Sequence, residues 1–528
     1  MKDRSFLTFG RRWSPVCLAG VVFAFGPARL IAGAAAAAPE PPVIGVRLPL
    51  DAKQPLRPNV YGVNCELLSR PFTHLQPGFM QKCAEADRPF FRYPGGTGAN
   101  YFNPLTGLLA SAGKRNYESL NEKIKGMNGG KGADPFKFFQ FARETQTDYS
   151  LVLNMGSVSL DENRRWLESV AQAGYKPHYF ELGNELYFGT YSQFFADGRA
   201  DADHAEKTAK MIRSIFPDAR IGVVISSLYY VSDSFLQEDI PTSEQRHREW
   251  TQALQGKDFY DAVIIHLYTR LGMPSDIQAK DVWPFAKTYQ QTLSYLDARF
   301  NSALDAVNAD FPGKPIWVTE YGTVAFNSDV LKNYGFPDSY WGSMHTTDMT
   351  LKLFGRPDVE LANRHSFARF VTWSRQTGED GRLPKDASFG ITNAYRHFTI
   401  IGPAVRNSAD FVKPQLEGVL NYRRAVDDGD SPEVEAGCFV AGDHGYLILI
   451  NKMTTTYTLD KVRSQSGGAE APVLWTTGLQ LAPRQDVELD KALADVNEMS
   501  SLDLNGANTQ TLTLPPYSVT RLELRFSK

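Results

Sequence analysis

The chain has 528 residues, of which 42% are hydrophobic and 22% are charged, as in globular rather than disordered proteins. Its 56 Lys and Arg residues oppose 59 Asp and Glu residues, which gives a formal net charge of -3. This balance excludes the strongly basic character of nucleic-acid-binding and membrane-surface proteins, so we expect neither partner. The sequence leaves the oligomeric state open.

The first 38 residues have the pattern of a bacterial-type signal peptide. Basic residues precede the apolar run Val16–Phe25, and the small residues Ala32–Ala38 follow it. The apolar run is shorter than a membrane-spanning helix. The pair Arg11-Arg12 leaves both the general and the twin-arginine export routes open. We therefore expect an exported protein, periplasmic or extracellular, with residues 1–38 removed and no membrane attachment once processed.

Residues 58–402 alternate short β-like runs with amphipathic helical stretches, which is the pattern of a parallel α/β fold. Most of the runs are apolar on both faces, as buried parallel strands are. Eight such units fit a closed (β/α)8 TIM barrel better than an open sheet. The predicted strands are Val60–Glu66, Pro89–Pro94, Tyr149–Met155, His178–Leu182, Arg220–Ser226, Ala262–Tyr268, Pro315–Glu320 and Ala368–Trp373.

Two of the helices between these strands have recognisable start and stop signals. Ser159 and Glu162 form a capping box, and Gly174 ends the helix that follows it. A second helix is predicted to begin after Asp203 and to stop at Pro217.

Residues 403–528 contain short, β-branched-rich segments separated by Gly, Asn, Asp and Pro, which is typical of an antiparallel β-sandwich. Residues 39–57 contain one more strand-like run, Val43–Leu50, which we expect to cross over and join this C-terminal domain. The predicted sandwich strands are Cys438–Val440, Tyr446–Ile450, Thr454–Leu459, Val473–Thr476, Thr511–Leu514 and Val519–Leu524.

The cysteines exclude a disulfide framework. Cys17 lies in the signal peptide, so the mature chain keeps Cys65, Cys83 and Cys438, an odd number. A bridge between Cys65 and Cys83 is one option, and two buried free thiols are the option we favour.

Two glutamates end predicted strands on the face of the barrel where active sites form. Glu185 follows the fourth strand in the run Phe180–Glu185, and Glu320 ends the seventh in Trp317–Gly322. Cleavage of a glycosidic bond with retention needs a carboxylic acid and a carboxylate about 5–5.5 Å apart. Either motif alone is also typical of an ordinary strand-end turn. Together, on strands that face each other across the barrel mouth, they predict a catalytic pair.

These motifs resemble those of the clan A glycoside hydrolases, in which the acid/base follows an Asn at the fourth strand and the nucleophile ends the seventh. The resemblance implies that Glu185 is the acid/base, that Asn184 contacts the sugar 2-hydroxyl and that Glu320 is the nucleophile. It also implies a retaining hydrolase that acts by double displacement, without a cofactor, on side chains of plant or microbial polysaccharides or on oligosaccharides.

Within this superfamily the chain most resembles the family 51 α-L-arabinofuranosidases. Four segments carry the resemblance: Arg92–Gly96, Asn154–Gly156, His266–Tyr268 and Leu514–Val519. The chain departs from the family pattern where an Asn, an aromatic residue and a Trp are usual, namely at Thr97, Leu267 and Tyr321. A β-glucuronidase or heparanase of family 79, which shares the Glu-Leu-Gly-Asn-Glu run, and a xylosidase-like enzyme therefore stay as alternatives.

Supporting residues are expected to tune the two carboxylates in opposite directions. Arg92 would keep Glu320 ionised, and Tyr268 would donate a hydrogen bond to the same carboxylate. Glu185 instead needs burial and a neighbouring negative charge, which keep it protonated until the glycosyl-enzyme forms. His266 would orient either carboxylate or touch the sugar.

Three further residues end predicted strands. Glu66 resembles a substrate-binding glutamate of the arabinofuranosidases, although a solvated loop glutamate fits equally well. Asn154 and Trp373 end the third and eighth predicted strands, where they could bind sugar hydroxyls or stack on a sugar face. For Trp373 we favour packing in the barrel wall.

Other chemistries have no sequence support. The nine histidines include no His-x-His or His-Glu-x-x-His spacing, so we expect no metal site. Phosphate-cradling glycine motifs are also absent, which argues against nucleotide chemistry. The non-enzyme alternative is a catalytically inactive carbohydrate-binding barrel.

Overall fold

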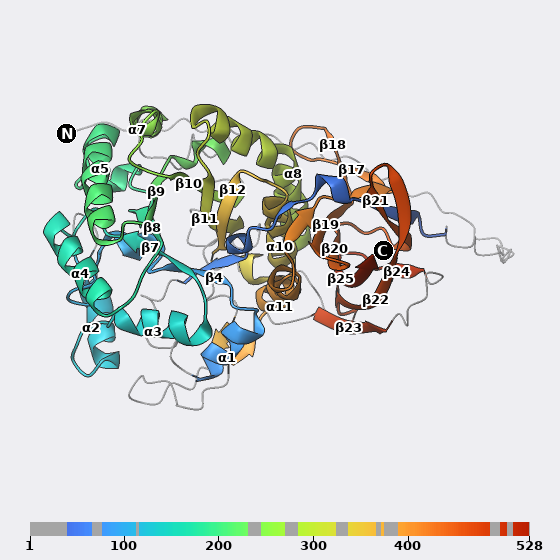
Figure 1. The fold of residues 1–528 in the computed structure, drawn as a ribbon, viewed down its shortest axis with the longest axis horizontal. Helices are drawn as coiled ribbons and strands as arrows, with labels where there is room; N and C mark the ends of the chain where they lie inside the picture. Colours follow the sequence, from blue (N-terminus) through green and yellow to red (C-terminus); the bar gives the residue numbers. More distant parts are fainter. Residues whose placement is uncertain are drawn as a thin grey trace, which may run out of the picture. The chain divides into compact units, whose positions relative to one another are not determined.

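The computed structural model describes residues 40–65, 77–111, 116–230, 244–269, 284–323, 336–365, 371–373, 389–485, 497–503 and 511–526. Residues 41–528 form one compact unit, whose ribbon is shown in Figure 1. The predicted signal peptide lies outside the described residues.

Eight parallel strands close into a barrel in the spatial order β10-β11-β12-β3-β4-β7-β8-β9 (Figure 1). Each strand pairs with its neighbours along the chain, which confirms the predicted TIM barrel. Nearly all strand residues are buried, as expected for strands covered by side chains on both faces. The strands are β3 (Gly62–Asn64), β4 (Phe90–Tyr93), β7 (Tyr149–Leu153), β8 (Tyr179–Leu182), β9 (Arg220–Val224), β10 (Ala262–Thr269), β11 (Ile316–Thr323) and β12 (Val359–Arg364).

The eighth strand of the barrel is not the predicted one. Strand β12 occupies this place and pairs with both β11 and β3. The predicted strand Ala368–Trp373 contributes only β13 (Val371–Trp373), which pairs with β14 (Phe389–Ile391) in a separate two-stranded sheet. The sequence pattern did not predict β12 as a barrel strand, because Glu360 interrupts its apolar run. Its carboxylate pairs with Arg220 on β9 at 2.7 Å, which satisfies this charge.

Helices connect the barrel strands along the outside, as Figure 1 shows for α3, α4 and α5. The α-helices are α1 (Pro77–Glu85), α2 (Glu118–Met127), α3 (Phe136–Thr145), α4 (Leu160–Gln172), α5 (Gly198–Ile215), α7 (Glu244–Leu254), α8 (Phe285–Asp310), α10 (Tyr340–Phe354), α11 (Asn393–Thr399) and α12 (Gly402–Arg406). Short 3-10 helices lie at Leu50–Ala52, Pro58–Val60, Thr97–Asn100, Gly189–Tyr191, Ser227–Tyr230 and Phe336–Asp338.

The capping box predicted for α4 is confirmed. The Ser159 hydroxyl accepts a hydrogen bond from the Glu162 backbone N–H at 3.2 Å, and the Glu162 carboxylate accepts one from the Ser159 backbone N–H at 3.0 Å. Both bonds satisfy donors that the first turn of a helix leaves without helical partners.

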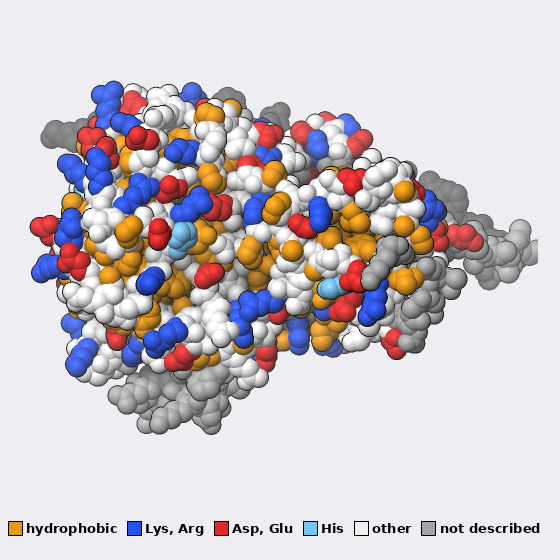
Figure 2. Space-filling view, in the orientation of Figure 1, with side chains coloured by type: hydrophobic (Ala, Val, Ile, Leu, Met, Phe, Trp, Pro, Cys, Tyr) orange, Lys and Arg blue, Asp and Glu red, His pale blue; other side chains and the backbone are white. Residues whose placement is uncertain are grey.

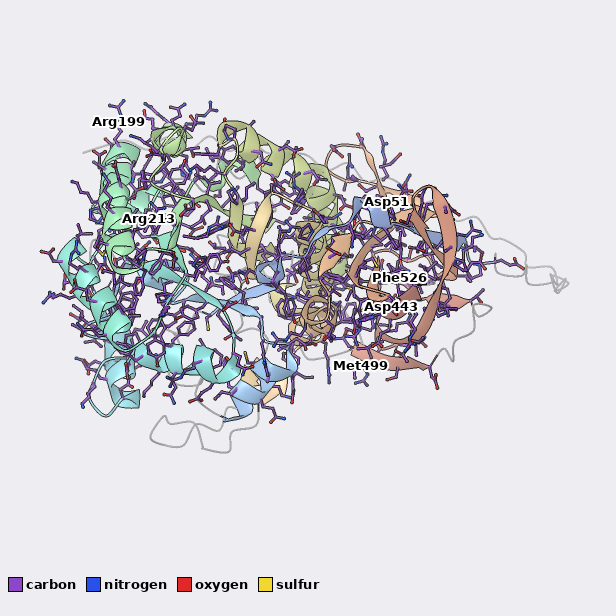
Figure 3. The ribbon with its side chains drawn as sticks, in the orientation of Figure 1. Asp51, Arg199, Arg213, Asp443, Met499 and Phe526 are labelled. Carbon is purple, nitrogen blue, oxygen red and sulfur yellow. The ribbon has the colours of Figure 1, made fainter. Side chains whose placement is uncertain are left out.

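Helix α5 begins earlier than predicted, before Asp203 rather than after it. The Asp197 carboxylate caps it and accepts a hydrogen bond from the Arg199 backbone N–H at 3.0 Å. Near the other end of the helix, Arg213 pairs with Asp261 at 2.8 Å, which fastens α5 to the start of β10. Figure 3 labels both arginines.

The C-terminal region folds into the predicted β-sandwich, and Val43–Pro49 joins it as strand β1. The sheet is mixed rather than purely antiparallel, because β1 pairs parallel with β21 and antiparallel with β16. The long strand β22 pairs first with β21 and then with β25 and β23. The strands are β1, β2 (Gln54–Pro55), β15 (Asp410–Val412), β16 (Gln415–Glu417), β19 (Val434–Ala441), β20 (His444–Asn451), β21 (Tyr457–Ser466), β22 (Ala469–Pro483), β23 (Asn497–Asp503), β24 (Leu512–Leu514) and β25 (Ser518–Phe526).

Two small hairpins complete the described structure, β5 (Phe102–Asn103) with β6 (Leu108–Leu109) and β17 (Asn421–Arg423) with β18 (Asp430–Pro432).

The barrel and the sandwich pack against each other through apolar side chains. Phe439 and Ile448 of the sandwich belong to the same buried cluster as the barrel interior. The Phe439 ring packs edge-on against the Phe354 ring of α10, with ring centroids 5.0 Å apart. The described cysteines Cys65, Cys83 and Cys438 are buried and form no disulfide with one another, which agrees with the option favoured from their number.

The surface carries charges of both signs. Over the face shown in Figure 2, Lys and Arg side chains are interspersed with Asp and Glu, in keeping with the balanced composition. Within the described ranges, no helix has the length and apolar character needed to cross a membrane.

Candidate active site

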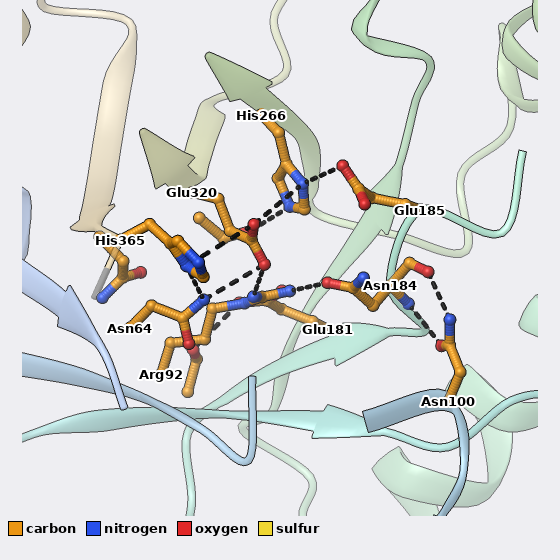
Figure 4. Close-up of polar contacts among 12 residues, drawn as sticks. Asn64, Arg92, Asn100, Glu181, Asn184, Glu185, His266, Glu320 and His365 are labelled. Carbon is orange, nitrogen blue, oxygen red and sulfur yellow. Dashed lines mark hydrogen bonds and ion pairs between the residues drawn. The ribbon is translucent and has the colours of Figure 1, made fainter. Parts of the chain in front are cut away.

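Glu185 and Glu320 lie on either side of one histidine ring (Figure 4). The His266 Nδ1 atom is 2.9 Å from Oε1 of Glu185 and 3.8 Å from Oε2 of Glu320. The distance between Oε1 of Glu185 and Oε2 of Glu320 therefore cannot exceed the sum of these two distances. This maximum separation lies near the lower end of the range found in inverting enzymes, about 6.5–9.5 Å. It is compatible with the separation of about 5–5.5 Å found in retaining enzymes.

Strand register brings these groups together. His266 on β10 is the register partner of Glu320 on β11, and Tyr268 follows two residues later on the same face of its strand. On the neighbouring strands β3, β4 and β7, Asn64 pairs with Arg92 and Arg92 with Ser150. These polar side chains form a layer across the barrel interior.

The backbone around Glu185 is held in an uncommon conformation. Glu185 has φ +48°, in the left-handed region that disfavours residues with a side chain. Gly183 precedes it with φ +79°, and a Cβ there would lie 2.3 Å from Leu186. Asn100 fixes this turn from both sides. Its Oδ1 accepts from the Asn184 N–H at 2.9 Å, and its Nδ2 donates to the Asn184 carbonyl at 2.6 Å.

Three side chains donate hydrogen bonds to the buried carboxylate of Glu320. Arg92 Nη1 donates to Oε1 at 2.6 Å, Asn64 Nδ2 donates to the same oxygen at 3.2 Å, and the Tyr268 hydroxyl donates to Oε2 at 2.5 Å. Both oxygens are thus fixed in place. Donors on three different strands orient this carboxylate.

The pKa of Glu320 is lowered well below its ordinary value of 4.5. Burial by itself would raise the pKa, but His266, His365 and Arg92 favour the negative charge, and the hydrogen bond from Tyr268 adds to their effect. Glu320 is therefore ionised at neutral pH, which is the state that a nucleophile needs.

Arg92 connects the two glutamate-bearing strands. It is fully buried and donates from Nε to Glu181 at 2.8 Å, from Nη1 to Glu320, and from Nη2 to Asn184 Oδ1 at 2.8 Å. Ser150 donates to the other oxygen of Glu181 at 3.1 Å. Burial alone would lower the pKa of Arg92, but the charges of Glu181 and Glu320 outweigh it and raise the pKa. The guanidinium thus stays charged and spans β4, β8 and β11.

One buried donor points to a ligand. Among the described atoms, Nδ2 of Asn184 is buried and has no hydrogen-bond partner, although its Oδ1 is held by Arg92. An unpaired buried amide donor costs about 1–3 kcal/mol, so such a group is expected to find its partner in a bound molecule. A sugar hydroxyl has the required acceptor.

Sequence reasoning missed several residues of this cluster, among them Asn64, Asn100, Ser150, Glu181 and His365. Glu181 stands inside the Phe180–Glu185 run, where its position on the strand, four residues before Glu185, was the available signal. His365 follows β12, the strand that was not predicted, and its Nδ1 lies 3.9 Å from Glu320.

One predicted supporting residue, Asn154, makes side-chain hydrogen bonds outside this cluster. Its Nδ2 donates to the Phe102 carbonyl on β5 and to the Ser157 hydroxyl, and its Oδ1 accepts from the Gly156 and Ser157 N–H groups of its own loop. Trp373 ends β13, outside the barrel sheet. Glu66 lies outside the described residues.

In the part of the chain that the structure describes, no group of His, Cys, Asp and Glu side chains is arranged to hold a metal ion.

Comparison with known proteins finds similarity in structure only. No family model and no curated protein matches the sequence. The family 51 arabinofuranosidase from Xanthomonas axonopodis pv. citri matches with a TM-score of 0.64 at 18% identity, over 92% of this chain and 100% of that one. A family 51 alpha-L-arabinofuranosidase from Bifidobacterium longum gives 0.62 at 16% identity, over 92% and 99%. A family 44 xyloglucanase from Paenibacillus polymyxa gives 0.57 at 13% identity, over 92% and 100%. The resemblance to these hydrolases is thus confirmed for the fold.

Proposed function

We propose that the protein is a retaining glycoside hydrolase in which Glu185 is the acid/base and Glu320 the nucleophile. The observation that carries the proposal is the position of both carboxylates within 4 Å of one His266 nitrogen. The lowered pKa of Glu320 and the unpaired Asn184 amide support it. A carbohydrate-binding barrel without activity would not require one ionised and fully oriented carboxylate beside a second, partly exposed one.

The reaction proceeds in two steps, formation of a glycosyl-enzyme and its hydrolysis. The Glu320 carboxylate attacks the anomeric carbon and forms an ester bond, while the bond to the leaving oxygen breaks and Glu185 gives that oxygen its proton. Glu185, now ionised, removes a proton from water. The resulting oxygen attacks the anomeric carbon and releases Glu320. Arg92 and Tyr268 stabilise Glu320 whenever it carries its charge, and Asn184 Nδ2 donates to the 2-hydroxyl.

For the substrate we propose an α-L-arabinofuranoside on a plant or microbial polysaccharide or oligosaccharide. Structural similarity to the two arabinofuranosidases supports this assignment, since both align over nearly their whole length. The test is hydrolysis of an aryl glycoside panel containing α-L-arabinofuranoside, β-D-glucuronide, β-D-xyloside and β-D-glucoside. The arabinofuranoside should give the largest kcat/KM. A preference for the glucuronide would replace the substrate assignment, and the absence of hydrolysis across the panel would contradict the proposed function.

Export fits this function, because polysaccharides are too large to enter a cell intact. We propose that residues 1–38 direct the export and are then removed, as their sequence pattern indicates. N-terminal sequencing of the secreted protein should begin near residue 39, and a mature protein that retains Met1 would contradict this.

Replacing Tyr268 by phenylalanine should move the acid limb of the pH profile upward. The variant loses a hydrogen bond to the ionised form of Glu320, and such bonds contribute about 1.5–3 kcal/mol. The pKa of Glu320 should therefore rise by about one unit or more. Because kcat/KM falls as pH drops through this pKa, the decline should begin at higher pH than in the wild type. Tyr446→Phe, on sandwich strand β20, is the matched control. An unshifted acid limb in Tyr268→Phe would contradict the role of this hydroxyl.

A further inference from the structure

The segment directly after Glu185 is held by one arginine from another part of the chain. Arg246 lies near the start of α7 and is buried. Its guanidinium packs over the ring of Trp250, 5.1 Å from the ring centroid. It donates hydrogen bonds to four backbone carbonyls: Tyr187 at 3.0 Å, Ala196 at 2.5 Å, Leu186 at 3.3 Å and Phe195 at 3.0 Å.

These four carbonyls belong to both ends of one loop. Leu186 and Tyr187 lie near the start of the connection between β8 and α5, directly after Glu185, and Phe195 and Ala196 lie near its end. A guanidinium offers several N–H donors in a rigid plane, and hydrogen bonds from a charged donor are about twice as strong as neutral ones. Arg246 therefore fastens the two ends of the loop to each other and to α7.

The loop in turn contacts the carboxylate of Glu185. The Tyr187 hydroxyl lies 3.4 Å from Glu185 Oε1 and 3.2 Å from the Ser227 hydroxyl. His247, next to Arg246, packs with its ring tilted against the Tyr187 ring, with centroids 5.0 Å apart, and its Nδ1 is hydrogen-bonded to the Ser226 hydroxyl at 2.7 Å. Two neighbouring residues of α7 thus hold Tyr187, one through its carbonyl and the other through its ring.

The positive φ of Glu185 explains why the backbone around it needs support. A residue with a side chain stays at positive φ only when its surroundings hold it there. Asn100 holds the backbone before Glu185, and the loop bound by Arg246 holds the backbone after it.

We propose that Arg246 is a positioning residue that keeps the acid/base Glu185 in line with the leaving oxygen. This inference rests on the proposed function. Arg246 acts through the loop of residues 186–196, and its removal impairs proton transfer more than it impairs attack by Glu320.

The first test compares leaving groups in Arg246→Gln. A dinitrophenyl glycoside departs with little protonation, so its kcat/KM should change by less than about threefold, whereas phenyl and alkyl glycosides should lose about 10- to 100-fold. Arg246→Lys keeps the charge but not the planar fork, and should fall between Arg246→Gln and the wild type. Arg248→Gln makes the same change at an exposed position of the same helix and should retain wild-type rates. An equal loss for all leaving groups would overturn the proposal, because it would indicate a general structural defect.

The second test does not need activity. In Arg246→Gln, hydrogen–deuterium exchange should become faster in peptides covering residues 186–196 and stay unchanged in the sandwich, while Arg248→Gln should resemble the wild type. Unchanged exchange in this loop would overturn the proposal even if the wild type hydrolysed no substrate of the panel. Conversely, an active wild type with unaltered leaving-group dependence in Arg246→Gln would overturn the inference and leave the proposed function standing.

Discussion

Replacing Glu320 by alanine should lower kcat/KM for the preferred aryl glycoside by about 10,000-fold or more, because the variant lacks the carboxylate that forms the ester bond. Azide should restore part of the activity towards a dinitrophenyl glycoside, since it can enter the space left by the carboxylate and attack the anomeric carbon. The product should be a glycosyl azide of inverted configuration. Steady-state rates and proton NMR of the azide product measure both effects.

The control for this substitution is Glu122→Ala, the same change on the surface of α2, where 71% of the Glu122 side chain is exposed. It should leave the rate within about twofold of the wild type. Glu320→Gln retains an oxygen that can accept from Arg92, so its thermal unfolding shows whether lost activity reflects lost structure. Residual activity near the wild-type level in a folded Glu320→Ala protein would exclude Glu320 as the nucleophile.

Replacing Glu185 by alanine should produce a loss that depends on the leaving group. Substrates with poor leaving groups need its proton and should lose about 100- to 10,000-fold in kcat/KM. A dinitrophenyl glycoside should still form the glycosyl-enzyme rapidly and then stall, because no base activates the water. Rapid-mixing kinetics should therefore show a burst of dinitrophenol followed by a slow steady state.

Azide distinguishes the two glutamates. In Glu185→Ala it should attack the glycosyl-enzyme, which speeds turnover of the dinitrophenyl substrate and yields a glycosyl azide of retained configuration. An inverted azide from this variant, or a loss of equal size for every leaving group, would contradict the acid/base assignment.

Regular patterns in the sequence were sufficient to predict the barrel architecture, although not every strand in it. Seven of the barrel strands were predicted at their observed positions, because each forms an apolar run buried on both faces. The capping box at Ser159 correctly predicted the start of α4. Strand β12 could not be found in the same way, because Glu360 interrupts its pattern and only the fold supplies its partner, Arg220. Helix α5 shows the same limit, since its cap at Asp197 precedes the apolar stripe.

The site was partly predictable for a related reason. Glu185 and Glu320 stand in recognisable runs at strand ends, and the contacts of Arg92 and Tyr268 with Glu320 are those expected from the sequence. Side chains whose partners lie far away in the chain gave no such signal. Arg246 is one of them, because four carbonyls of another loop define its environment.

The central claim is that Glu185 and Glu320 act on one anomeric carbon from opposite sides. Proton NMR of the wild-type reaction, recorded before mutarotation, tests it most directly. A first-formed sugar with the same anomeric configuration as the substrate is the predicted result, since two displacements at one carbon restore the starting geometry. A first-formed sugar of inverted configuration would contradict the account, because it would mean that water attacks directly and that Glu320 forms no bond to the sugar.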